Sequence, residues 1–231
     1  MLRVQILGLA LVSALMMSVV AAGSASAETE LHQWLINHKL LASPVTVHRL
    51  SLLLLEDTHT GVRVHCHWFA TGTVGPHGLA LIKSITLELL GSKDLVLCLY
   101  DKVPNLTCKE NEMPDVLAIN LPWHTQLILK GAEVRDLLLG HGSGRPGWKL
   151  TCKNVLGGTS TDTCEEEEGR PVSLSMKNET NGSGVRGTWD ANNPRVKCSE
   201  GGGEPATGIV EGTVLTESPS SKEHLLISFG P

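Results

Sequence analysis

Two histidines, His65 and His67, flank Cys66 in a segment that alternates apolar and polar residues from 62 to 68. On a strand, residues two apart share a face, so the two imidazoles lie together while Cys66 points the other way. Neutral imidazole nitrogens at this spacing bind zinc when a third ligand comes from elsewhere. Arg63 shares the face and repels a cation, so we expect a polar outer face and no metal site.

Residues 142–147 read Gly-Ser-Gly-Arg-Pro-Gly and match the glycine spacing of a dinucleotide-binding loop. That loop has to lie between a strand and a helix, whose N-terminus meets the pyrophosphate. Here Pro146 and an alternating segment from Trp148 follow, which favours a plain glycine turn. Ser143 has His141 two residues before it, where a nucleophile elbow requires glycine. We predict neither a cofactor nor a catalytic serine at this place.

Glu165 to Glu168 form a run of four carboxylates close to Asp162. Carboxylate oxygens bind calcium, but the EF-hand loop places its acids at alternate positions around a glycine turn. A solvated acidic loop explains the run. The sequence therefore identifies no catalytic, cofactor-binding or metal-binding residue.

The cysteines are the residues whose chemistry is clearest, and an exported chain with six of them indicates three disulfides. They are Cys66, Cys98, Cys108, Cys152, Cys164 and Cys198. Three precede Gly140 and three follow it, so full pairing requires at least one bridge between the halves. Among the possible pairings we favour Cys66–Cys98 and Cys152–Cys198 between strands, and Cys108–Cys164 between loops.

Export is predicted from the N-terminal segment. A positive start at Arg3 precedes an apolar stretch over residues 4–20, and small residues end at Ala25-Ser26-Ala27. This order is typical of a secretory signal peptide, residues 1–27, cleaved to leave Glu28 first. The protein is then expected in a secreted, extracytoplasmic location, which is oxidising and permits disulfides.

Charge and hydropathy exclude two classes of partner. The chain has 19 basic and 24 acidic residues without a basic cluster, so we expect no nucleic-acid binding. After signal cleavage no apolar stretch has the length of a membrane helix, so we expect no membrane span.

Periodicity of two is the strongest structural signal, and it recurs in short segments separated by Gly, Pro, Asn and Ser. The segments are residues 62–68, 148–153, 172–177, 185–190, 195–199 and 225–229. They predict an all-β fold, an antiparallel sandwich or barrel stapled by disulfides. The best candidates for short helical turns are residues 110–119 and 134–139. We expect residues 28–231 to form a single β-rich domain, or two lobes tied by a disulfide.

Two further expectations concern burial. Apolar runs at residues 52–55, 95–99 and 127–129 favour strands buried on both faces. Trp68, Trp148 and Trp189 fall on the apolar side of alternating segments, which leaves Trp34 and Trp123 as candidates for an aromatic binding surface.

Six short blocks resemble recurring segments of uncharacterised secreted six-cysteine proteins of high-GC Gram-positive bacteria. The blocks are Trp34-Leu-Ile-Asn37, Gly72-Thr-Val-Gly-Pro76, Leu121-Pro-Trp-His-Thr125, Pro146-Gly-Trp-Lys-Leu-Thr-Cys152, Thr161-Asp-Thr-Cys164 and Gly208-Ile-Val-Glu-Gly-Thr213. The resemblance implies export and disulfides. It implies no activity and no site.

The sequence thus favours a binding or structural protein at the cell exterior, with an extracellular partner or ligand that the sequence does not identify. A secreted hydrolase with an active site carried on loops is the alternative, since loops carry catalytic groups on many folds.

Overall fold

The computed structural model describes residues 32–58, 60–86, 98–102, 108–109, 114–182, 184–189, 196–200, 206–220 and 222–228. The predicted signal peptide, residues 1–27, lies outside the described residues. From His32 to Pro231 the chain is one compact unit. No helix within the described part is long and apolar enough to cross a membrane.

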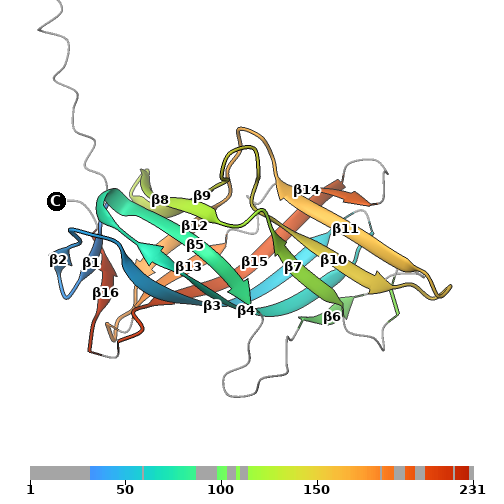
Figure 1. Ribbon diagram of the computed structural model, residues 1–231, viewed down its shortest axis with the longest axis horizontal. Helices are drawn as coiled ribbons and strands as arrows, with labels where there is room; N and C mark the ends of the chain where they lie inside the picture. Colours follow the sequence, from blue (N-terminus) through green and yellow to red (C-terminus); the bar gives the residue numbers. More distant parts are fainter. Residues whose placement is uncertain are drawn as a thin grey trace, which may run out of the picture. The chain divides into compact units, whose positions relative to one another are not determined.

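Eight strands close into an antiparallel barrel in which each strand pairs with the next barrel strand along the chain (Figure 1). They are β3 (Val45–Asp57), β4 (Arg63–Val74), β5 (Leu79–Thr86), β8 (Trp123–Lys130), β9 (Glu133–Leu139), β12 (Ser173–Asn178), β13 (Val185–Trp189) and β15 (Ala206–Glu217). The last strand, β15, pairs with both β13 and β3 and so closes the ring. The all-β, disulfide-stapled barrel predicted from periodicity is confirmed.

Beyond the barrel, the long strands β4, β3 and β15 continue as the centre of a second sheet. One edge of this extension is β6 (Cys98–Lys102), which pairs with the first residues of β4. On the other side lie β14 (Val196–Glu200), β11 (Thr159–Glu166), β10 (Gly147–Lys153) and β7 (Asp115–Ile119), in that order. The barrel wall therefore divides at two places. Along β15 the neighbouring strand changes from β13 to β14, and along β4 it changes from β5 to β6 (Figure 1).

A small sheet packs against the opposite end of the barrel. It contains β16 (Leu225–Ile227), β1 (Trp34–Ile36) and β2 (Lys39–Leu40) in this order. The indole of Trp34, with no exposed surface, donates to the carbonyl of Gly78 in the 3-10 turn η1 (Pro76–Gly78). Asn178 at the end of β12 makes two hydrogen bonds with the backbone of Ile227. These contacts hold the small sheet over the end of the barrel.

The six cysteines form three disulfides: Cys66–Cys98, Cys108–Cys152 and Cys164–Cys198. The first pairing was predicted correctly. Cys108–Cys152 confirms that one bridge joins the two halves, although this pairing was not predicted. The other two predicted pairings, Cys152–Cys198 and Cys108–Cys164, are wrong. Cys164 lies on β11, where it faces Cys198 of β14 directly, with 3.9 Å between the Cα atoms. The polar sequence around Cys164 is typical of a loop and hid this strand.

Both candidate helical segments contain strands instead. The described end of the first is β7, and the second lies within β9. Charged residues interrupt the apolar alternation that would have indicated strands. In β9, for example, the charged Asp136 points into the barrel. Within the described ranges, the helical turn that does occur is η1.

Two of the apolar runs lie in strands and contain exposed residues, so the expectation of burial on both faces is wrong. Leu52 of β3 and Leu129 of β8 are 50% and 55% exposed. Leu52 belongs to the outer side of the barrel wall, while its neighbour Leu53 points inward and is buried. Leu129 shares the phase of the buried Leu127 but lies near the end of β8, where it is exposed. In the third run, residues 95–97 lie outside the described residues, and Leu99 is exposed.

Candidate functional site

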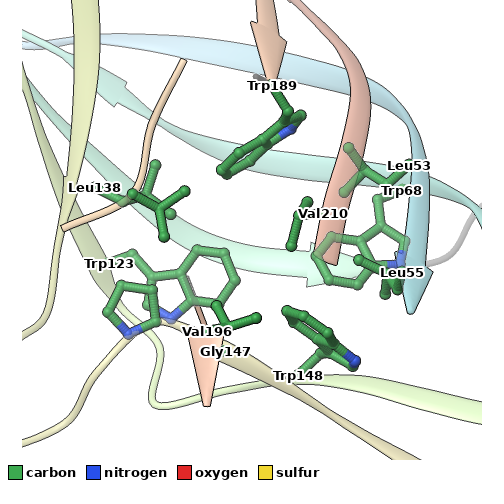
Figure 2. A pocket seen from close by; sticks show the side chains of 12 residues that line it. Leu53, Leu55, Trp68, Trp123, Leu138, Gly147, Trp148, Trp189, Val196 and Val210 are labelled. Carbon is green, nitrogen blue, oxygen red and sulfur yellow. The ribbon is translucent and has the colours of Figure 1, made fainter. Parts of the chain in front are cut away.

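An apolar slot opens inside the barrel at the place where its wall divides (Figure 2). Leu53, Leu55 and Val210 line it from the strands that the barrel and the extension share. The slot encloses about 380 Å³ of empty space, including its part open to solvent, but a water-sized body fits in only about 40 Å³ of it. The side chains that line the slot therefore leave little free space between them.

Four of the five tryptophans of the chain line this slot, each from a different strand. Figure 2 shows the indole rings of Trp68, Trp123, Trp148 and Trp189 around the common space. The indole of Trp123 donates to the carbonyl of Ile119 at 2.8 Å. The buried indole nitrogens of Trp68 and Trp189 have no hydrogen-bond partner among the described residues. Two N–H donors are thus available inside an apolar wall.

Small residues on β13 and β15 make room for the larger inward-facing side chains. A Cβ at Gly208 would lie 2.4 Å from a methyl carbon of Val196 and 3.2 Å from the ring of Trp148. A Cβ at Gly187 would lie 2.9 Å from a methyl carbon of Leu174. Alternation of large and small inward-facing residues is how a small barrel fills its interior.

A second cavity continues the slot toward the small sheet. Its lining includes Leu53, Trp68, Trp123, Leu138 and Trp189, all of which also line the slot. It encloses a further 380 Å³ of empty space, of which about 30 Å³ admits a water-sized body. Unlike the slot, it is also lined by a charged side chain, Arg49. The described lumen thus passes from a purely apolar region to one with a polar floor.

The polar floor is an ion pair in the centre of the barrel. Arg49 of β3 and Asp136 of β9 meet at 3.0 Å, and their side chains are 5% and 0% exposed. Arg49 Nη2 and Asp136 Oδ1 have no hydrogen-bond partner in the described part of the chain. Sequence reasoning missed this pair, although an Asp amid the apolar residues of β9 was its visible signal.

A separate, open depression lies between the loop before β10 and the loop after β11. It has a volume of about 490 Å³ and is lined by Ser143, Arg145 and Glu166 to Glu168, among others. Burial raises the pKa of Glu166 to about 7, although the Val172 amide and Arg145 oppose the shift. The Val172 amide donates to the Glu166 carboxylate, which stabilises the ionised form. The acidic run is therefore not wholly solvated, because Glu166 shares the buried side of β11 with Cys164.

The other residues singled out from sequence occupy ordinary positions. His65 and His67 are exposed on β4, on the face opposite the buried Cys66. His141 to Gly144 form a turn before β10, as the glycine-turn interpretation predicted. The expectation that Trp34 and Trp123 lie on the surface is wrong, since they are 0% and 5% exposed.

One cluster within the described residues has the compactness of a metal site, formed by Asp162, Cys164 and Cys198. The two cysteines are joined in a disulfide and offer no thiolate. The metal ligand that sulfur provides is the thiolate, so this cluster does not have the chemistry of a zinc site.

No model of a protein family matches this chain, and comparisons with curated proteins and with solved structures find no match. The resemblance to secreted six-cysteine proteins stays a prediction from the sequence. The candidate site rests on the geometry of the barrel interior.

Proposed function

We propose that this chain is an exported binding protein whose barrel takes one slender, apolar small molecule. The observation that carries the proposal is the tryptophan-lined slot at the division of the barrel wall. An eight-stranded barrel encloses an interior that side chains fill or that holds one small ligand. The three disulfides are consistent with an oxidising extracytoplasmic location.

The size of the slot defines the ligand class. A dry engineered cavity that binds benzene measures about 150 Å³, far more than the 40 Å³ in which a water-sized body fits here. A bulky ring system does not fit without displacement of the tryptophans. A linear alkyl chain is narrower, and we propose that it enters between the rings, where each methylene that enters contributes about 0.8 kcal/mol.

Titration of the mature protein with linear alkanes from pentane to octane tests this proposal, with tryptophan fluorescence as the readout. We expect the affinity to rise about fourfold per methylene, the equivalent of about 0.8 kcal/mol. The branched isomer isooctane is the matched ligand control and should bind at least tenfold more weakly. Equal affinities for octane and isooctane, or no binding of either, contradict the proposal.

A pair of variants locates the binding. Leu138 lines both cavities and is buried, whereas Leu52 is exposed on the outer wall. Leu138→Phe fills the lumen and should weaken octane binding at least tenfold. Leu52→Phe makes the same change outside the barrel and should leave the octane affinity unchanged.

The second candidate function, a secreted hydrolase, would use the open depression around Glu166. A carboxyl with a pKa of about 7 can act as a general acid or base near neutral pH. Binding is the better supported function, because Glu166 is only 6% exposed and its carboxylate is held by the Val172 amide. Hydrolysis of chromogenic esters or glycosides by the wild type, lost in Glu166→Gln, would favour the enzyme.

A further inference from the structure

The floor of the barrel lumen contains more polar atoms than its own contacts satisfy. Arg49, Asp136, Thr125 and Thr216 all belong to the inward side of the barrel strands, and none is more than 4% exposed. Thr216 of β15 lies opposite Arg49 in the strand register. Asp136 lies opposite Leu127, two residues from Thr125 on the same face of β8. The four side chains therefore form one polar layer.

Each member of this layer has an unsatisfied atom. Arg49 Nη2, Asp136 Oδ1 and the hydroxyls of Thr125 and Thr216 have no hydrogen-bond partner within the described residues. A buried polar atom without a partner costs about 1 to 3 kcal/mol. The layer thus offers a donor, an acceptor and two hydroxyls to a polar group in the lumen.

One member of the layer, Arg49, lines the second cavity, which would hold the ligand. Trp68 and Trp189 line the same cavity, and their indole N–H groups are also unpartnered in the described structure. On β3, Arg49 and Leu55 mark the two ends of the lining, separated by about 20 Å of strand. A linear molecule with its polar end at Arg49 would extend its chain into the tryptophan slot.

The charge of the layer selects the polar group. Asp136 already neutralises Arg49 at 3.0 Å, so a carboxylate would bring an uncompensated negative charge into an apolar lumen. An uncharged hydroxyl accepts a hydrogen bond from Arg49 Nη2 and donates one to Asp136. We propose that the ligand is an uncharged linear alcohol whose hydroxyl binds the Arg49–Asp136 pair. This proposal rests on the proposed function.

Octanol, octanoate and octane at about pH 8 are suitable probes for the mature protein, because they share a chain length and differ in the head group. We expect octanol to bind at least tenfold more tightly than octanoate. An octanoate affinity equal to or above that of octanol would overturn the assignment of an uncharged head group.

The double variant Arg49→Met/Asp136→Leu removes the polar layer's ion pair without leaving one charge buried alone. It should weaken octanol at least tenfold and leave octane within about twofold of wild type. The matched control is Arg135→Met/Glu133→Leu, which removes the neighbouring pair of β9, 3.2 Å apart and outside the two cavities. This control should change neither affinity.

The outcomes separate the two proposals. If none of the three probes binds, the proposed binding function fails and the head-group assignment fails with it. If octane and octanol bind and the double variant alters both equally or neither, the slot is confirmed while the role of Arg49 and Asp136 is refuted; ordered water then satisfies the layer.

Discussion

Arg49 and Asp136 meet in the centre of the barrel from strands on opposite walls. Their strands, β3 and β9, are four positions apart in either direction around the eight-stranded ring. The Nη1–Oδ2 distance of 3.0 Å therefore bridges the whole lumen. For the proposed apolar ligand, this contact would limit the depth of entry.

The first prediction concerns the stability that this pair provides. Arg49→Met leaves Asp136 buried without a cation, and we expect a loss of about 3 to 5 kcal/mol in the free energy of unfolding. Arg49→Met/Asp136→Leu removes both charges, and its stability should lie within about 1 to 2 kcal/mol of wild type or above it. Urea denaturation measures both. If Arg49→Met were as stable as wild type, this result would contradict the burial of Asp136 in an ion pair with Arg49.

The second prediction is a pH dependence caused by Glu166. Burial raises its pKa in the folded protein from 4.5 to about 7, so the folded state binds the proton more tightly than the unfolded chain. The stabilising effect is full below about pH 4.5 and is lost as the pH rises through about 7. We therefore expect the Glu166 contribution to the free energy of unfolding to fall across this interval.

Glu166→Gln tests this directly, because glutamine keeps the carbonyl that accepts from the Val172 amide. The variant should gain stability relative to wild type at about pH 8 and should not at about pH 4. Glu168, which is 84% exposed, provides the matched control, and Glu168→Gln should show no such difference. If the free energy of unfolding changed with pH in the same way for wild type and Glu166→Gln, the raised pKa of Glu166 would be refuted.

The third prediction concerns the disulfides. Non-reducing peptide mapping should recover Cys66–Cys98, Cys108–Cys152 and Cys164–Cys198. Replacement of Cys108 and Cys152 by alanine opens a loop of 44 residues, for which the chain-entropy model gives a loss of about 4 kcal/mol. Thermal unfolding measures the effect. Free thiols in the mature protein would contradict the oxidised framework.

The fourth prediction is cleavage of residues 1–27. N-terminal sequencing of secreted material should begin at Glu28, because Ala25-Ser26-Ala27 supplies the small residues that signal peptidase requires. Retention of Met1 in a membrane fraction would show that the segment is not removed.

The alternation of Val64, Cys66 and Trp68 with Arg63, His65 and His67 was sufficient to predict a strand of an antiparallel sheet. Local periodicity is encoded residue by residue and needs no knowledge of partners. The presence of three disulfides and of a bridge between the halves followed from the number and positions of the cysteines. The Cys66–Cys98 pairing was also correct.

The partners across the barrel were decided by the tertiary structure. Cys164 pairs with Cys198 because β11 and β14 are neighbours, which no local pattern in the acidic segment indicates. Asp136 is buried because Arg49, 87 residues earlier in the sequence, reaches it across the lumen. Trp123 faces inward beside Trp189 because closure of the ring brings β8 and β13 around one space. Strand periodicity is a local property, whereas ring closure, register and burial of charge depend on contacts between distant segments.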